Sequence, residues 1–250
     1  MKFDRSGRLL VADAFRGLIA VAPDRSVTVL ADSVNGRRML FPNDLDIAQD
    51  RGVWFSDSSQ RFDQHHWMLE FWEGRGTGRL LRYDPHTGRT EVKLDGLRFA
   101  NGVALGPQDA FVLVNETTAA CVTRLWLKGP RAGQRDVFAT LPGYPDNLTY
   151  NGGGIFWVVV ATPRVGVLDR LAAWPRVRRV LYRIPAAIRD PKPERMAWVI
   201  GLDTDGRVVR DWQDPAGRFG SLASVVEAGG RLYMGSIQTK TLGWVEVPGR

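Results

Sequence analysis

Short apolar runs alternate with tight polar turns along almost the whole chain, and one turn-plus-strand unit recurs. It is seen in residues 3–13, 47–57, 105–114, 149–160 and 226–234, where each apolar run follows a turn rich in Gly, Asp or Asn. The first residues of these units are separated by 44, 58, 44 and 77 positions. Repeats of about 40–50 residues are typical of propeller blades, and each unit is followed by further strand-like runs, as a four-stranded blade requires. The pattern therefore predicts an all-β protein, a β-propeller.

We expect one propeller domain over residues 1–250, with five blades in this chain. The blades are predicted near residues 1–32, 41–97, 99–141, 144–214 and 221–247. The last blade shows only about three strand-like runs. The first begins already inside its second-strand pattern, so we expect the chain to lack part of a blade, or a whole one, at its N-terminus.

Residues 164–192 interrupt the β pattern. Apolar residues such as Val167, Leu171 and Val180 recur there at roughly helical spacing with arginines between them, although Pro175 limits any continuous helix. A surface insertion is the favoured interpretation. A lid over the pocket on the propeller axis is a second interpretation. A contact with a membrane surface is a third, because basic amphipathic segments prefer interfaces.

Three of the repeats carry an amide or carboxylate at an equivalent place, just before the strand: Asn43, Asn101 and Asp146. Equivalent residues of a propeller converge on its axis, so these side chains are predicted to face one another. A ring of oxygen donors suits a hard cation such as Ca²⁺. The alternative is that Asn43 and Asn101 only stabilise turns, as Asn often does before Asp or Gly.

Charge and composition narrow the range of functions. The formal net charge is +7, but most arginines are spread over turns and strand edges and form no basic stripe, so nucleic-acid binding is not expected. No apolar run reaches the roughly 18 residues of a membrane span. Cys121 is the single cysteine, which excludes an internal disulfide, and we expect a buried, unreactive thiol. The sequence has no phosphate-binding glycine loop, serine nucleophile elbow or zinc-ligand spacing.

An ordered set of motifs resembles the strictosidine synthase-like proteins over nearly all of the chain. The motifs include Phe41-Pro42-Asn43-Asp44, Phe55-Ser56-Asp57-Ser58-Ser59, Gly78-Arg79-Leu80-Leu81, Phe99-Ala100-Asn101-Gly102 and Pro142-Gly143-Tyr144-Pro145-Asp146-Asn147. The wider superfamily contains paraoxonases and SMP-30/gluconolactonase enzymes, which are six-bladed propellers. The resemblance implies that one N-terminal blade is absent here. It also implies a central Ca²⁺ held by Asn43, Asn101, Asp146 and Asn147, with a fifth ligand, a Glu, that belongs before Met1.

The resemblance implies a Ca²⁺-dependent esterase or lactonase that acts on a small-molecule ester or lactone. The family's condensation of an amine with an aldehyde relies on a Glu in the last blade. The matching residues here, 220–224, hold no carboxylate, so that reaction is not expected. The alternative is a catalytically inactive propeller that serves as a binding or scaffold module.

The sequence offers only weak candidates for a catalytic acid or base. These are His65 and His66, in the long excursion between Ser58 and Gly78, and Glu116, just after a predicted inner strand. Turn and surface roles are the alternative for all three. Membrane association is a further expectation, through a segment before Met1 or through residues 164–192. The sequence indicates no particular compartment.

Overall fold

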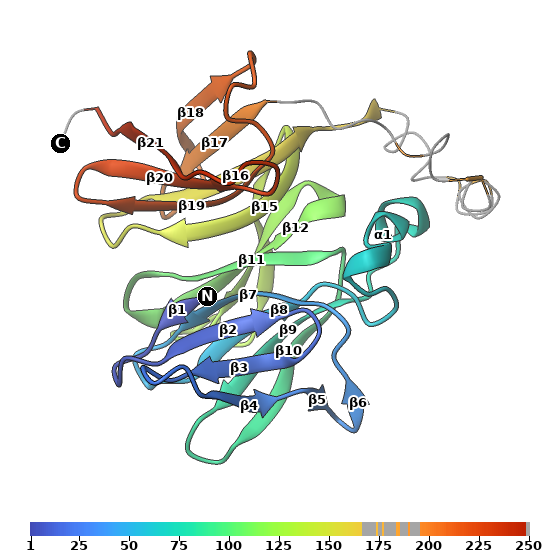
Figure 1. Cartoon of the computed structure of the whole chain (residues 1–250), viewed down its shortest axis with the longest axis vertical. Helices are drawn as coiled ribbons and strands as arrows, with labels where there is room; N and C mark the ends of the chain where they lie inside the picture. Colours follow the sequence, from blue (N-terminus) through green and yellow to red (C-terminus); the bar gives the residue numbers. More distant parts are fainter. Residues whose placement is uncertain (167–173, 175–176, 178–183, 186–189, 191–195, 249–250) are drawn as a thin grey trace.

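The computed structural model describes the chain except residues 167–173, 175–176, 178–183, 186–189, 191–195 and 249–250. Five antiparallel sheets follow one another along the chain and are arranged as the blades of a β-propeller (Figure 1). The predicted all-β propeller is confirmed. The predicted insertion or lid at residues 164–192 lies largely outside the described residues.

Within each blade, consecutive strands are neighbours. The first sheet contains β1 (Lys2–Phe3), β2 (Leu9–Asp13), β3 (Gly17–Val21) and β4 (Val27–Ala31). A small hairpin of β5 (Ser33–Val34) and β6 (Arg37–Arg38) leads to the second sheet, of β7 (Pro42–Ile47), β8 (Val53–Asp57), β9 (Gly78–Asp84) and β10 (Arg89–Leu97). The third contains β11 (Ala100–Leu105), β12 (Phe111–Glu116), β13 (Cys121–Trp126) and β14 (Arg135–Thr140).

The fourth sheet contains β15 (Gly143–Tyr150), β16 (Phe156–Pro163), β17 (Ala197–Leu202) and β18 (Val208–Asp214). The fifth has three strands among the described residues, β19 (Leu222–Ala228), β20 (Arg231–Ser236) and β21 (Gly243–Glu246). The helices are short. They are η1 (Gln64–His66) and α1 (Met68–Glu73) between β8 and β9, η2 (Pro107–Asp109) and η3 (Thr117–Ala119).

Aspartates close several of the turns between strands. Asp4 Oδ1 accepts hydrogen bonds from the backbone N–H groups of Ser6 and Arg8, both at 2.9 Å, and Gly7 supplies the positive φ of 80°. Asp203 repeats this arrangement with the backbone of Asp205 and Arg207. Such side-chain-to-backbone bonds favour a turn over continued strand, which is why the Asp/Gly spacing marked the strand ends in the sequence.

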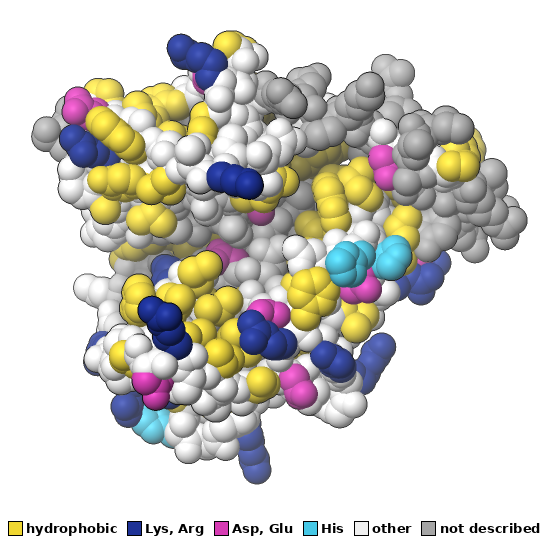
Figure 2. Space-filling view, viewed as in Figure 1, with side chains coloured by type: hydrophobic (Ala, Val, Ile, Leu, Met, Phe, Trp, Pro, Cys, Tyr) yellow, Lys and Arg dark blue, Asp and Glu magenta, His cyan; other side chains and the backbone are white. Residues whose placement is uncertain are grey.

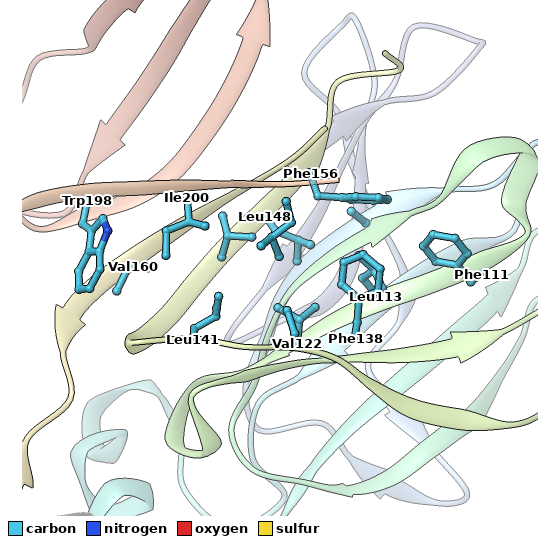
Figure 3. Close-up of a cluster of buried hydrophobic side chains, with 14 residues drawn as sticks. Phe111, Leu113, Val122, Phe138, Leu141, Leu148, Phe156, Val160, Trp198 and Ile200 are labelled. Carbon is cyan, nitrogen blue, oxygen red and sulfur yellow. The ribbon is translucent and has the colours of Figure 1, made fainter. Parts of the chain in front are cut away.

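The core lies between the sheets, because each inner strand packs against the sheet of the next blade. Figure 3 shows the interface of the third and fourth sheets, where Phe111, Leu113 and Phe138 meet Leu148 and Phe156. All five side chains are buried. Two further clusters join the first sheet to the second and the second to the third, and a fourth joins the fourth sheet to the fifth. This packing holds the inner strands β7, β11, β15 and β19 side by side.

The first and last sheets share no strand pairing among the described residues. Both carry exposed apolar side chains, with Phe3 at 72% exposure in the first sheet and Trp244 at 51% in the last. In the space-filling view the surface is hollowed between the last sheet, above, and the first sheet, below (Figure 2).

Candidate functional site on the propeller axis

The inner strands share a one-residue bulge near their first residues. Between Pro42 and Leu45, β7 advances three residues while β8 advances two, and β11 does the same against β12. The strand β15 repeats the bulge between Pro145 and Leu148, and β19 has an equivalent one-residue shift. A bulge redirects side chains that would otherwise follow the alternation of the strand. The bulged residues are Asn43 and Asp44 in β7, Asn101 and Gly102 in β11, Asp146 and Asn147 in β15, and Ala223 in β19.

Asn101 and Asp146 meet directly. Asn101 is 4% exposed, and its side chain lies close enough to the Asp146 carboxylate to influence its ionisation. Asn101 Nδ2 also lies 3.2 Å from Thr117 Oγ1, which in turn donates to the backbone carbonyl of Pro145 at 2.8 Å. These contacts orient the Asn101 amide with Nδ2 engaged, while its Oδ1 is buried without a hydrogen-bond partner among the described residues.

Two further amide oxygens are buried without a hydrogen-bond partner near the same place. Asn147 Oδ1 is one, next to Asp146 in the bulge of β15. Asn115 Oδ1 is the other, on a side chain that donates through Nδ2 to the backbone carbonyl of Asp146 at 2.6 Å. An unpartnered buried oxygen costs free energy, on the order of 1–3 kcal/mol, unless a ligand, ion or water satisfies it. The cluster is therefore arranged to accept a positively charged or hydrogen-donating group.

The electrostatics of the cluster favour a cation. Burial raises the pKa of Asp146 to about 7, with the polar Asn101 side chain opposing the shift and the negative charge of Asp44 adding to it. Burial likewise raises the pKa of Asp44, against the effect of the nearby N-terminal ammonium. The Met1 nitrogen is 4.0 Å from Asp44 Oδ1. Two carboxylates that both resist ionisation in a buried site gain from a bound positive charge.

Asp44 and Asn115 belong to the site but were not among the residues predicted from the sequence. Asp44 Oδ2 accepts the backbone N–H of Val103 at 3.0 Å, which ties β7 to β11. Asn115 ends the apolar run of β12, and its buried position is evident only once β12 is paired with β11. The Asn-Asp pair at 43–44 was the one available signal for Asp44.

Asn43 is half-buried at the first bulge, and no hydrogen bond links its side chain to Asn101 or Asp146 within the described part of the chain. The structure thus brings Asn101, Asp146 and Asn147 into one cluster and places Asn43 at the matching point of the neighbouring blade. No group of three or more His, Cys, Asp or Glu side chains suited to a metal is found among the described residues. The donors here are instead mainly amide oxygens with carboxylates, the oxygen ligands that Ca²⁺ accepts.

The weak catalytic candidates lie elsewhere. His65 and His66 are both exposed on η1. The His65 ring stacks at 5.4 Å from that of Phe15, and His66 Nδ1 is 2.7 Å from Asp63 Oδ1. Glu116 uses both carboxylate oxygens, accepting from the N–H of Arg98, in the connection that leads into its blade, at 2.7 Å and from Thr123 Oγ1 at 2.5 Å. Cys121 is buried, and burial raises its thiol pKa to about 11, so it carries no reactive thiolate at neutral pH.

Aromatic side chains gather next to the bulged ends of the inner strands. Phe71 of α1 contacts the rings of Phe99 and Tyr144, at centroid distances of 6.0 and 5.2 Å. Phe99, two residues before Asn101, adopts the left-handed φ of 58°. Such a conformation costs roughly 1–2 kcal/mol in a non-glycine residue and is often found next to functional residues.

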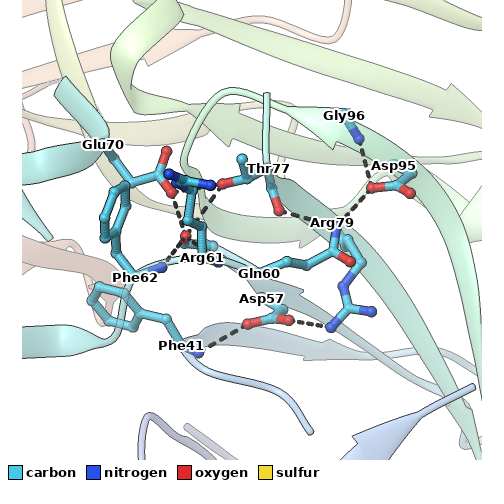
Figure 4. Close-up of polar contacts among 11 residues, drawn as sticks. Phe41, Asp57, Gln60, Arg61, Phe62, Glu70, Thr77, Arg79, Asp95 and Gly96 are labelled. Carbon is cyan, nitrogen blue, oxygen red and sulfur yellow. Dashed lines mark hydrogen bonds and ion pairs between the residues drawn. The ribbon is translucent and has the colours of Figure 1, made fainter. Parts of the chain in front are cut away.

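The excursion that carries α1 is held by a buried polar network, shown in Figure 4. Glu70 accepts hydrogen bonds from Ser59 Oγ and from Thr77 Oγ1, the latter at 2.6 Å. Ser59 Oγ also accepts the backbone N–H groups of Arg61 and Phe62. These bonds fix α1 and its aromatic residues beside the axial cluster.

Comparison with known proteins agrees with this architecture. A profile of the family described as strictosidine synthase matches residues 43–130. Protein strictosidine synthase-like 10 of Arabidopsis thaliana is 36% identical over 260 residues, which cover 97% of this chain and 67% of that protein. The adipocyte plasma membrane-associated protein of Homo sapiens is 38% identical over 249 residues, 95% of this chain and 60% of the relative.

The chain belongs to the strictosidine synthase-like family. It spans 54% of the length of strictosidine synthase-like 13 of Arabidopsis thaliana, to which it is 38% identical over 218 residues, or 85% of this chain. No helix in the described part of the chain is long and apolar enough to cross a membrane.

Solved structures agree on the fold. A gluconolactonase from Xanthomonas campestris superposes with a TM-score of 0.65 at 19% identity, covering 94% of this chain and 67% of that one. A calcium-binding regucalcin from Agrobacterium tumefaciens gives a TM-score of 0.60 at 15% identity, covering 93% and 65%. The chain therefore shares its propeller fold with a gluconolactonase and a regucalcin.

Proposed function

We propose that the axial cluster binds a divalent cation, Ca²⁺ in the first place, and that the chain hydrolyses an ester or lactone there. The observation that carries this proposal is the pair of buried, unpartnered amide oxygens of Asn101 and Asn147 in the same cluster as the Asp146 carboxylate. Asn43, Asn101, Asp146 and Asn147 would hold the ion, with Asp44 as a nearby second negative charge.

When bound, Ca²⁺ would supply Lewis-acid chemistry, polarising a substrate carbonyl and stabilising the oxyanion. The residues of the chain prepare that position. Thr117 holds the Asn101 amide by its nitrogen, which leaves Oδ1 as the free acceptor. Asn115 of β12 donates to the backbone carbonyl of Asp146, so the bulge that presents Asp146 and Asn147 is held from the neighbouring blade. We assign no general base to His65, His66 or Glu116.

Calorimetric titration with Ca²⁺, together with hydrolysis of a panel of aryl esters and lactones, tests the proposal. We expect Asn101→Ala and Asp146→Asn to weaken Ca²⁺ binding by 100-fold or more and to abolish hydrolysis. Asp205→Asn, on an exposed hairpin turn, is the matched control and should behave as the unmodified chain. Excess EDTA should stop turnover and added Ca²⁺ should restore it. Full turnover in EDTA, or in both axial variants, would overturn the proposal.

One observation favours a second candidate, a cation-binding propeller without catalytic activity. The fourth bulge carries Ala223, whose side chain has no oxygen donor, whereas the bulges of β7, β11 and β15 each present at least one amide or carboxylate side chain. The same experiment separates the two candidates. Saturable Ca²⁺ binding that depends on Asp146, without hydrolysis of any ester or lactone in the panel, would support the binding module.

A further inference from the structure

A second site candidate lies away from the axis, between the β5–β6 hairpin and the second sheet. It is a cavity of about 260 Å³ lined by Arg37, Arg38, Leu40, Gln60 and Arg79. Three of its five lining residues are arginines, and none is acidic. The hairpin contributes Arg37 and Arg38, while Arg79 is the second residue of β9. The strand β9 lies two positions outward from the inner strand β7, which places Arg79 about 10 Å from the axial strand.

Arg79 is the buried member of this group. Only 3% of the residue is exposed, and its Nη2 lies 2.5 Å from Asp57 Oδ2 (Figure 4). Asp57 is fully buried and also accepts the backbone N–H of Phe41 at 2.9 Å, so the ion pair is fixed on its carboxylate side. On the other side, the Nε of Arg79 is buried without a hydrogen-bond partner among the described residues. A buried guanidinium N–H without an acceptor costs free energy that a bound acceptor would recover.

The other two arginines are not neutralised. Both are exposed, and neither forms an ion pair with a carboxylate of the described chain. Arg38 donates one N–H to the backbone carbonyl of Phe15 at 2.8 Å, which anchors it while leaving its charge uncompensated. Asp57 offsets one of the three positive charges, and a further carboxylate, Asp95, accepts a hydrogen bond from Gln60 Nε2 at 3.0 Å at the edge of the cavity. The lining arginines still give the cavity a net positive charge. A dianion would balance it.

We propose that this cavity binds a phosphate group, carried by a phosphate monoester or by inorganic phosphate. Arginine is suited to this because its planar guanidinium presents paired N–H donors that match phosphate oxygens. The buried Arg79 would add a donor in a low-dielectric setting, while Arg37 and Arg38 close over the anion from the hairpin. This site does not depend on the axial cluster, and its ligand needs no cation.

Isothermal titration calorimetry on the full chain at 0.15 M salt tests the proposal. The probes are inorganic phosphate, glycerol 3-phosphate, and phosphatidylcholine vesicles with and without phosphatidic acid. The test variant is Arg37→Ala with Arg38→Ala. The control is Arg89→Ala with Arg135→Ala, which removes the same charge from exposed positions outside the cavity. Arg79→Lys keeps the charge opposite Asp57 but removes the guanidinium fork.

We expect saturable binding by the unmodified chain and the control, with affinity at least tenfold lower in the hairpin variant and reduced in Arg79→Lys. Binding of the soluble probes would assign the site to a free phosphate or phosphate ester. Binding only to vesicles with phosphatidic acid would assign it to a lipid headgroup. The proposal is overturned if the two double variants lose affinity equally, if the hairpin variant binds as the unmodified chain, or if no probe binds saturably.

Discussion

The same one-residue backbone bulge occurs in β7, β11, β15 and β19, but the side chain that it presents in β19 differs from those in the other three strands. In each, one extra residue turns a side chain out of the strand alternation at the start of an inner strand. The first three present Asn43, Asn101 and Asp146 with their neighbours, and the last presents Ala223. The fold thus provides four equivalent positions, and the residue at each position decides whether it contributes an oxygen donor.

The bulge of β11 and the bulge of β19 also differ in how tightly the surrounding backbone is packed. At the β11 bulge, Gly102 lies so close to β15 that an added Cβ would be 2.4 Å from Leu148 N and 2.6 Å from Asn147 Cα. Opposite the β19 bulge, an added Cβ on Gly235 would meet the side chain of Ser224, with the hydroxyl at 2.5 Å and the Cβ at 3.9 Å. Backbone atoms cannot move aside without displacing the strand, whereas a serine side chain can rotate.

The largest predicted effect follows from this difference. Gly102→Ala should lower the free energy of unfolding by about 1–3 kcal/mol, because overpacking forces β11 and β15 apart. It should also weaken Ca²⁺ binding, since Asn101 and Asn147 would separate. Gly235→Ala is the matched variant in the last blade and should cost clearly less. Urea denaturation with calorimetric Ca²⁺ titration measures both effects. Equal destabilisation by the two substitutions would contradict the contrast between the bulges.

An intermediate effect is predicted for a residue placed in the last bulge. Ala223→Asp should tighten Ca²⁺ binding by about tenfold, or roughly 1.4 kcal/mol, because added ligand charge raises Ca²⁺ affinity. Val226→Asp adds the same charge on the same strand, at an exposed position outside the bulge, and should leave the affinity nearly unchanged. If both variants tighten binding equally, the effect is general electrostatics and the fourth bulge does not face the axis.

The sequence predicted the propeller and the equivalence of Asn43, Asn101 and Asp146, which lie in matching bulges, because a repeat period and the turn chemistry of Asp and Gly are local signals. It did not predict the parts of the site that depend on pairing between strands. The bulge itself, the role of Asp44 in accepting the Val103 N–H and the orphaned oxygen of Asn115 all arise from register. Glu116 shows the converse, since both oxygens of a carboxylate that the sequence offered as a catalytic candidate accept hydrogen bonds, from the Arg98 N–H and from Thr123.

The long connection between β8 and β9 has no counterpart in the last blade. There the residues joining β20 to β21 are largely exposed, with Ile237 at 76% and Leu242 at 64%. The second blade instead buries Glu70 with Ser59 and Thr77, and one carboxylate oxygen of Glu70 has no partner among the described residues. Burial raises the pKa of Glu70, while the hydroxyl hydrogen bonds oppose that shift.

The smallest predicted effect is the pH dependence that Glu70 adds. The pKa of Glu70 is higher in the folded chain than its ordinary value of 4.5, so folding favours the protonated carboxyl group. The contribution of Glu70 to the free energy of unfolding is therefore lost as the pH rises from 4.5 through the pKa of the folded chain. Glu70→Gln stays neutral, so it should match the unmodified chain at acidic pH and exceed its stability above this window, by less than the two effects above. Denaturation midpoints of the two chains measure the difference between approximately pH 4 and pH 8, a range that brackets such pKa shifts. Glu91→Gln, at an exposed position, is the control. A Glu70→Gln chain that is less stable at neutral pH would show that the ionised carboxylate, held by Ser59 and Thr77, is what keeps the excursion folded over the axial cluster.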